Sequence, residues 1–120
     1  MKKNPLIYLN DILFSTDLIG QYIAGLSFLA FDESYDIQDK VLRRLEIIAE
    51  AAKKLPDSTR LDHPEVPWKS IIGLRNIITH TYDEVNLEEI WNIVTTRLPE
   101  TKKQIQDIHD SLEDSKSSSG

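Results

Sequence analysis

Apolar residues recur at helical spacing along almost the whole chain, and prolines mark where the pattern starts and stops. Side chains three and four positions apart share one face of an α-helix, so this spacing predicts amphipathic helices. Pro5 and Pro67 stand where a helix can begin without losing a hydrogen bond, and Pro56 stands where one must stop. No stretch gives a convincing strand pattern, and the sequence therefore predicts an all-α protein.

The pattern predicts four main helices and one short connecting helix. Ser34 or Asp36 can cap the second main helix, and Asn86 with Glu89 resembles a capping box at the start of the fourth. Pro99 lies inside the fourth pattern, where its missing N–H predicts a kink or break. In chain order we expect a helix over about 5–24, a helical connector over 27–31, a helix from 34–36 to 55, a loop over 57–65, a helix from Pro67 to about Tyr82–Asp83, and a helix from 86 to at least 112.

Composition limits the possible classes of protein. The 120 residues suit one domain, which we place at 1–114, with a serine-rich tail at 115–120 that should be disordered. No apolar run approaches the ~20 residues that span a bilayer, the first residues do not form a signal peptide, and there is no cysteine. We therefore expect a soluble, cytoplasmic protein. The net charge of -6 argues against broad nonspecific nucleic-acid binding, but it permits a local basic site.

The segment Leu74–Tyr82 carries an arginine, an asparagine, a histidine and a tyrosine within two helical turns. On a helix, Leu74, Ile77 and Ile78 fall on one side, while Arg75, Asn76, Thr79 and His80 spread over the other. Tyr82 returns close to the line of Arg75, at the seam between the two sides. One alternative is an ordinary amphipathic helix with a solvated polar face.

The other alternative is a catalytic face for RNA cleavage without a metal. This reaction needs a base for the ribose 2′-hydroxyl, an acid for the leaving oxygen and a cation for the phosphorane charge. His80 can serve in acid–base steps, Arg75 can bind phosphate, and Asn76 can orient the histidine ring or bind a phosphate oxygen. One helix supplies a single copy of each group, so a two-fold dimer that pairs this helix with its mate would complete the cleft. The histidines lack metal-ligand spacing, and we expect no metal and no cofactor.

The spacing R-x4-H-x-Y of Arg75, His80 and Tyr82 resembles the signature of HEPN ribonucleases, and more narrowly that of the HepT-like toxin family. Further blocks resemble the same family: Leu45–Lys53, Pro67-Trp68, Gly73–Asn76, Val85–Leu87 before Trp91, and Leu98-Pro99. The resemblance implies a dimeric, antiparallel HEPN bundle and a metal-independent endoribonuclease with Arg75, His80 and Asn76 as catalytic residues. It also implies a partner, a minimal nucleotidyltransferase antitoxin that adenylylates Tyr82. One departure is Asn86, where the family often has aspartate.

Two other functions remain open on the sequence. The chain could be a catalytically weak HEPN binding module that engages a nucleotidyltransferase, or a helical interaction protein with no role in RNA cleavage. Structural roles are expected for the remaining conspicuous residues. We expect Trp68 and Trp91 to be core anchors. Glu46 and Glu50 should be surface charges or partners of Arg75. Lys53, Lys54 and Arg60 should form a solvated helix end, which could instead extend a basic rim toward RNA.

Overall fold

The computed structural model describes the backbone of residues 4–83 and 86–119, and the side chains of residues 4–79 and 86–115. Within those ranges the chain forms helices joined by short connections and no strand, so the all-α prediction is confirmed. The helical elements are α1 (Pro5–Ile23), α2 (Phe28–Glu33), α3 (Tyr35–Lys54), α4 (Asp57–Asp62), α5 (Trp68–Ile72), α6 (Leu74–Asp83), α7 (Leu87–Asn92), the π-helical turn η1 (Ile93–Arg97) and α8 (Leu98–Ser119).

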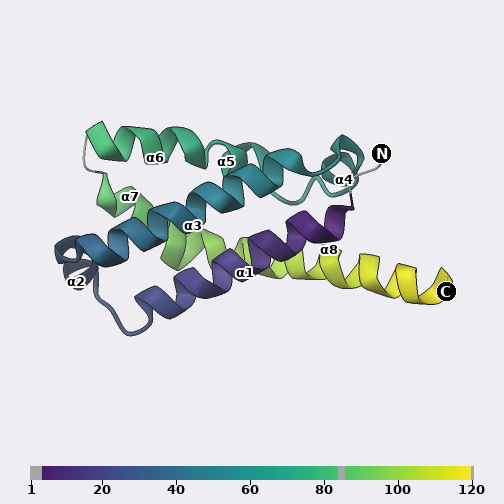
Figure 1. The fold of residues 1–120 in the computed structure, drawn as a ribbon, viewed down its shortest axis with the longest axis horizontal. Helices are drawn as coiled ribbons and strands as arrows, with labels where there is room; N and C mark the ends of the chain where they lie inside the picture. The colour runs from purple at the N-terminus through teal and green to yellow at the C-terminus, as the bar shows by residue number, and fades with distance from the viewer. Residues whose placement is uncertain (1–3, 84–85, 120) are drawn as a thin grey trace.

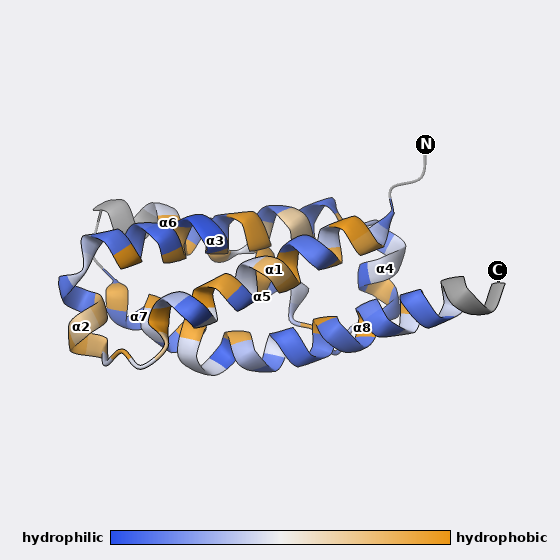
Figure 2. Cartoon of the chain, turned by 60° about the horizontal axis from the view of Figure 1, so that its bottom comes forward, coloured by the Kyte–Doolittle hydropathy of each residue, from blue (hydrophilic) through white to orange (hydrophobic). Residues whose placement is uncertain are grey.

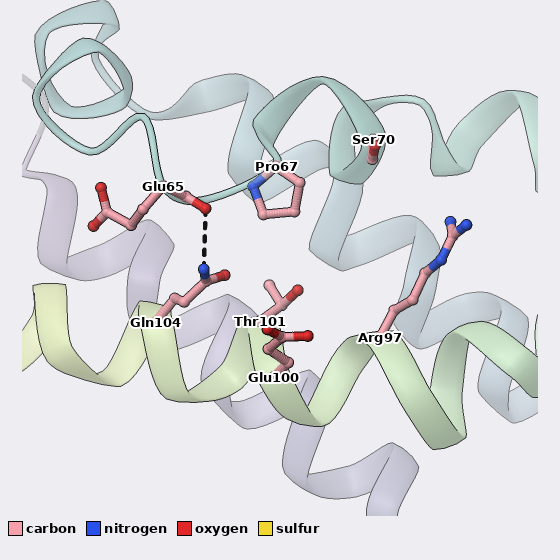
Figure 3. A pocket seen from close by; sticks show the side chains of 7 residues that line it. All are labelled: Glu65, Pro67, Ser70, Arg97, Glu100, Thr101 and Gln104. Carbon is pink, nitrogen blue, oxygen red and sulfur yellow. Dashed lines mark hydrogen bonds between the residues drawn. The ribbon is translucent and has the colours of Figure 1, made fainter.

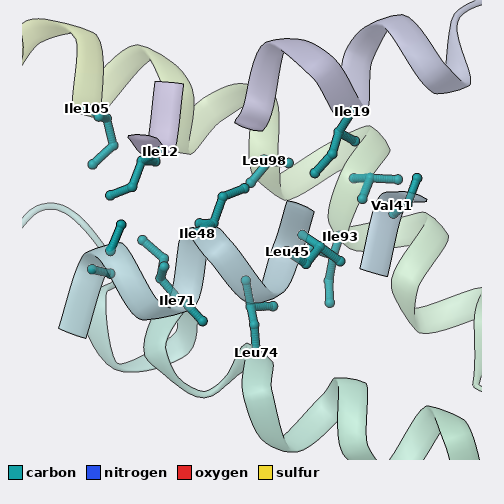
Figure 4. Packing of buried hydrophobic residues seen from close by; sticks show 14 of the residues in the cluster. Ile12, Ile19, Val41, Leu45, Ile48, Ile71, Leu74, Ile93, Leu98 and Ile105 are labelled. Atoms are coloured by element: carbon teal, nitrogen blue, oxygen red, sulfur yellow. The ribbon is translucent and has the colours of Figure 1, made fainter. Parts of the chain in front are cut away.

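The long helices run along the length of an elongated bundle (Figure 1). Helix α1 packs against α3 and α8, and α5 and α6 both pack against α3. These helices share one hydrophobic core (Figure 4), in which Leu45 and Ile48 of α3 are fully buried. Full burial of such a side chain contributes about 1.5–3 kcal/mol. The outer side of α8 is mostly hydrophilic (Figure 2), as expected for a helix that covers the core on one face only.

Polar caps fix the starts of the first three helices. The Asn4 side chain accepts a hydrogen bond from the Leu6 amide at 3.0 Å, and the Ser27 hydroxyl accepts one from the Ala30 amide at 3.2 Å. Ser34 caps α3 through the Ile37 amide at 3.2 Å, which decides between the two predicted caps. Each of these side chains satisfies an amide that has no partner inside its helix.

The loop predicted over 57–65 is partly wrong, because Asp57–Asp62 forms the short helix α4. Arg60 of this helix donates hydrogen bonds from Nη1 to the carbonyl oxygens of Ala52 and Lys53, both at 3.0 Å, and its guanidinium also contacts the Asp57 carboxylate. Those two carbonyls belong to the last turn of α3, where a cation is favourable. The six-residue helix is thus tied to the end of α3 through Arg60, and Arg60 does not extend a basic rim.

The third predicted helix is divided at Gly73. Pro67 precedes α5 as its cap residue, and the predicted anchor Trp68 is buried and donates a hydrogen bond to the His63 carbonyl oxygen at 2.9 Å. The Gly73 amide closes the last turn of α5 on the Lys69 carbonyl at 2.9 Å, and α6 then begins at Leu74. A Cβ at Gly73 would lie 3.1 Å from the Lys69 carbonyl oxygen, so this tight turn suits glycine.

The fourth predicted helix begins as expected but changes its hydrogen bonding before Pro99. The Asn86 side chain accepts a hydrogen bond from the Glu89 amide at 3.3 Å, and the Glu89 carboxylate accepts one from the Asn86 side chain at 2.6 Å. No break occurs at Pro99. The chain passes through the π-helical turn η1, which ends with the Leu98 amide donating to the Ile93 carbonyl, and α8 follows directly.

The prediction of four main helices and one connector therefore needs correction. In the described part of the chain there are two short connecting helices, α2 and α4, and two of the main helices are divided. The helical backbone of α8 reaches Ser119, into the stretch for which disorder was expected, while the domain boundary at residue 114 stays a prediction. None of the helices in the described ranges has the length and hydrophobicity that a membrane span requires.

Candidate functional site

Helix α6 presents Arg75 and Asn76, two of the polar residues singled out in the sequence, on a surface that faces away from the core. Leu74 and Ile78 are buried at 5% and 6% exposure, and Ile77 is half-buried, whereas Arg75 and Asn76 are exposed. The predicted division of the helix into an apolar and a polar side is confirmed for these residues. Burial of the apolar side against α3 fixes which way the polar side points.

The Arg75 guanidinium is available to bind an external group. Within the described residues, no acidic side chain pairs with it, and Glu46 instead pairs with Arg43 at 3.3 Å. Glu50 is half-buried on α3, and in the same part of the chain it forms no ion pair with Arg75. The sequence left two roles open for Glu46 and Glu50, surface charges or partners of Arg75, and the second role is not found among the described residues. An unpaired guanidinium on an open helix face can take a phosphate in bidentate geometry.

Asn76 is the neighbour of Arg75 on the open side, and its own amide N–H is used by the Gly73 carbonyl at 3.0 Å. Among the described contacts, its side chain has no hydrogen bond, so both its donor and its acceptor can serve a ligand. Thr79 is also exposed, but its hydroxyl donates to the Arg75 carbonyl at 2.9 Å and is thus occupied. The exposed face of α6 therefore offers a ligand the Arg75 guanidinium and the adjacent Asn76 amide.

His80 and Tyr82 both lie on α6, but their side chains are outside the described residues. The predicted approach of Asn76 to the His80 ring, and of Tyr82 to the line of Arg75, therefore stay predictions. The other two histidines have separate partners: His63 lies 3.5 Å from a Glu65 carboxylate oxygen, and His109 lies 3.4 Å from one of Asp110. No group of three or more potential metal ligands occurs among the described side chains, and metal independence itself stays a prediction.

The remaining residues considered in the sequence have mainly structural roles. Trp91 is half-buried and packs against the rings of Phe31 and Phe28, with centroid distances of 5.2 and 6.2 Å, so it is a core anchor as predicted. Lys53 and Lys54 are exposed at the end of α3. Figure 1 shows that end of α3, beside α4, at the opposite end of the molecule from the end of α6. A basic rim that joins these lysines to the motif is therefore not formed within one chain.

Sequence reasoning missed a pocket between α5 and α8, beside the start of α6. Its lining includes Ser70 of α5, Arg97 of η1 and Thr101 of α8. A hydrogen bond from the Gln104 amide to the Glu65 carbonyl oxygen, at 3.0 Å, joins its two walls across 39 positions of sequence. No local spacing could reveal this pocket, because its walls come from segments that meet only in the folded bundle.

Comparisons with known proteins agree with this reading. The family model "Ribonuclease HepT-like" matches residues 12–108. A "Putative RNase" of Caldanaerobacter subterraneus subsp. tengcongensis is 38% identical over 88% of this chain and 95% of its own length. A "Probable ribonuclease HepT" of Thermococcus cleftensis is 32% identical over 90% of this chain and 98% of its own.

A third relative is longer than this chain. The "Gamma-glutamylcyclotransferase and putative RNase" of Methanocaldococcus jannaschii is 38% identical over 97% of this chain, which spans 52% of that protein. No solved structure matches the chain. The family match covers the bundle from α1 to α8, including the exposed Arg75–Asn76 face. This chain is a member of the HepT-like ribonuclease family.

Proposed function

We propose that the chain is a metal-independent endoribonuclease that serves as the toxin of a toxin–antitoxin pair. The observation that carries the proposal is the open face of α6, where an exposed, unpaired Arg75 stands beside Asn76 in a chain of a ribonuclease family. This guanidinium has no acidic partner among the described residues, and its planar fork fits a phosphate in bidentate geometry.

In the proposed reaction, His80 transfers protons and Arg75 stabilises charge. A histidine removes the proton from the ribose 2′-hydroxyl, whose oxygen attacks the adjacent phosphorus, and the 5′-oxygen of the next nucleotide leaves after it is protonated. The products are a 2′,3′-cyclic phosphate and a 5′-hydroxyl, so the atoms balance without a metal or a water. Arg75 neutralises the negative charge that grows on the phosphorane oxygens, and Asn76 binds a phosphate oxygen or orients the histidine.

A homodimer would supply the second set of groups. One base and one acid are needed in the same step, and one chain carries a single histidine in the motif. A two-fold axis beside α6 would place two copies of Arg75 and His80 around one cleft. The position of α5 and α6 along one edge of the bundle (Figure 1) supports this arrangement, because the outer side of α6 is left uncovered within the chain.

The proposed partner is a minimal nucleotidyltransferase that acts as antitoxin by adenylylating Tyr82. Tyr82 follows Arg75 by seven positions, which is nearly two helical turns, so helical spacing predicts that the two residues share about the same line of α6. An adenylate on the phenol oxygen would put a phosphodiester beside the guanidinium. Its negative charge would compete with RNA for Arg75, and its bulk would obstruct the cleft.

The decisive experiment is incubation of the purified full chain with a mixed-sequence RNA, with and without excess EDTA. Cleavage that leaves 2′,3′-cyclic phosphate ends and is unchanged by EDTA is the expected result. Cleavage that EDTA abolishes would contradict the metal-free mechanism. Absence of any cleavage, together with stable binding to the proposed nucleotidyltransferase partner, would favour the alternative of a catalytically weak binding module.

A further inference from the structure

A pocket of about 350 Å³ opens between α5 and α8, outside the Arg75–His80 motif (Figure 3). Its polar groups come from Ser70 above, from Arg97, Glu100 and Thr101 below, and from Gln104 at one end. A volume of this size is at the lower end of what small-ligand sites occupy, and it suits one nucleotide better than a larger group. Its lining combines charged and uncharged polar groups, so it suits a ligand that has both a charged group and hydrogen-bonding groups.

Thr101 offers the pocket a hydroxyl that the described chain does not use. Its side chain is buried at 6% exposure, yet it has no hydrogen-bond partner among the described residues. The hydroxyls of Thr16, Thr79 and Thr95 each donate a hydrogen bond to the carbonyl oxygen four positions earlier, at 2.7–2.9 Å. Thr101 makes no such hydrogen bond within the described residues. Figure 3 shows its hydroxyl directed into the pocket. Because this hydroxyl has no partner within the described chain, it is free to form a hydrogen bond with a ligand oxygen.

Arg97 supplies the charge of the site. It is the last residue of the π-helical turn η1, it is exposed, and it forms no ion pair within the described part of the chain. Single π-helical turns inside α-helices are frequent at functional sites, because the extra residue redirects the side chains that follow. Here the turn leads into the segment of α8 whose side chains line the pocket.

The acceptors of the pocket lie apart from its donors. Gln104 donates its amide N–H to the Glu65 carbonyl oxygen, so its own amide oxygen is left to accept, and Figure 3 shows it on the inner side. The Glu65 carboxylate points away from the pocket in the same view, so Glu100 is the carboxylate that remains near it. A bare phosphate would be repelled by Glu100. A nucleotide can place its phosphate at Arg97 and Ser70, and its sugar hydroxyls or base N–H groups at Glu100 and Gln104.

A small hollow, lined mainly by apolar side chains, adjoins this pocket on the inward side of α6. It shares Ser70, Arg97 and Thr101 with the larger pocket and reaches Leu74, the residue before Arg75. Ser70 and Arg75 are five positions apart, on either side of the turn at Gly73, and at 100° per residue their side chains project from different sides of the helix. An RNA strand held at Arg75 would therefore reach the pocket by passing around the helix, with the pocket taking a nucleotide away from the phosphate at Arg75.

We propose that the pocket between α5 and α8, formed around Ser70, Arg97 and Thr101, binds one nucleotide of the RNA substrate at a position apart from the cleaved phosphodiester. The inference rests on the proposed ribonuclease function and adds to it a second contact that selects the substrate. Base selection would come from Gln104 and Glu100, whose acceptors favour a base edge that offers N–H donors.

The test compares Arg97→Gln and Thr101→Val with Lys103→Gln as the matched control. Lys103 is exposed on α8 and does not line the pocket, so its variant loses a charge from the same helix without touching the site. For Arg97→Gln we expect KM for a short RNA to rise about tenfold or more, as for loss of one charge-assisted contact, with kcat within about twofold. Lys103→Gln should change KM less than about twofold. Thr101→Val keeps the shape of the side chain and should also raise KM.

Binding is measured separately from cleavage by titrating the four nucleoside 5′-monophosphates into the full chain while recording backbone amide NMR spectra. Shifts centred on Ser70, Arg97, Thr101 and Gln104, weakened in Arg97→Gln, are expected. If the protein cuts RNA but KM and base preference are unchanged in Arg97→Gln and Thr101→Val, the pocket proposal is wrong and the ribonuclease stands. If nucleotides bind there but no RNA is cut, the ribonuclease proposal fails instead.

Discussion

At the scale of single residues, Arg75 and Arg97 differ from the other three arginines, each of which has a described partner. Arg43 pairs with Glu46 at 3.3 Å, Arg44 lies over the Phe14 ring at 5.8 Å, and Arg60 caps α3, whereas Arg75 is exposed and unpaired within the described chain. No described contact of the Arg75 side chain stabilises the bundle. A role toward a phosphate ligand accounts for an arginine at this position.

We expect Arg75→Ala and His80→Ala each to reduce RNA cleavage by at least about 100-fold, the usual effect of removing charge stabilisation or an acid–base group. Gel assays of RNA cleavage measure the loss, and circular dichroism checks that helix content is retained. Arg43→Ala is the control, because it removes an exposed arginine from α3. A His80→Ala protein that cuts at the wild-type rate would contradict the assignment.

Tyr82→Phe tests whether the tyrosine is a regulatory handle. Since the phenol oxygen is the proposed acceptor of the adenylate, the variant should not be modified when it is incubated with the proposed nucleotidyltransferase partner and ATP. It should keep at least part of its cleavage activity, because no proton transfer is assigned to the phenol. Mass spectrometry of the wild-type peptide locates the modification. Adenylate on another residue, or a modified protein that still cuts RNA, would refute this proposal.

Ser15 provides a prediction about stability. Its side chain is fully buried in α1, and its hydroxyl has no hydrogen-bond partner among the residues that the structure describes. Ser15→Ala removes that hydroxyl, leaves almost the same volume and adds a better helix former, so it should stabilise the fold by about 1 kcal/mol. Urea unfolding followed by circular dichroism measures the change. Ser111→Ala, at an exposed position of α8, should change stability by a few tenths of that, and a destabilised Ser15→Ala would mean that the hydroxyl is satisfied.

The residue pattern of α6 was largely predictable, because burial follows the helical period. Leu74 and Ile78 lie inward and Arg75 and Asn76 outward, as the spacing requires. The partner of Arg75 was not predictable in the same way. Which charges meet depends on rotamers and on how neighbouring helices are rotated, and Glu46 takes Arg43 on its own helix instead.

At the scale of elements, most boundaries followed from caps and prolines, and the errors share a physical cause. Segment 57–65 was predicted as a loop because it is polar and bounded by prolines, but α4 forms there through a tertiary contact, in which Arg60 binds the end of α3. The division at Gly73 and the π-helical turn at 93–97 leave the apolar period almost intact. Periodicity alone therefore could not reveal them.

Arg60→Ala should destabilise the fold by about 1–2 kcal/mol, because two carbonyl oxygens at the end of α3 lose a charged donor. The comparison is Arg43→Ala, which breaks a single exposed ion pair and should cost no more than about 0.5 kcal/mol. The side chain of Arg60 is 22% exposed and that of Arg43 is 61% exposed, so solvent replaces the second more easily. Equal unfolding midpoints in urea for the two variants would show that the cap contributes nothing special.

At the scale of the whole molecule, the sequence could predict the all-α class but not what the helices enclose. The pocket of Ser70, Arg97 and Thr101 exists because α8 returns beside α5, with Gln104 bound to the Glu65 carbonyl across 39 positions. Local patterns describe each helix and its inward face, but they do not specify which two helices leave a gap between them. That information is tertiary, and only the folded bundle contains it.

The uncovered side of α6 is the surface at which we expect two chains to assemble. If two copies of α6 meet at a two-fold axis, light scattering at micromolar concentration should give twice the 13.8 kDa of one chain. Thr79 is exposed on that helix and lies one turn from Arg75. Thr79→Arg would then bring like charges together across the axis, with a repulsion of about 2 kcal/mol for two charges ~8 Å apart at an effective dielectric constant of 20.

We therefore expect Thr79→Arg to shift the protein toward monomer and to lose RNA cleavage in parallel, because the cleft needs groups from both chains. Thr95→Arg is the matched control: Thr95 is also exposed, and its hydroxyl donates to the carbonyl four positions earlier at 2.7 Å, but it lies on η1. The control should keep the wild-type mass and activity. A wild-type chain that is monomeric while cutting RNA, or a monomeric Thr79→Arg protein with full activity, would show that one chain suffices for catalysis.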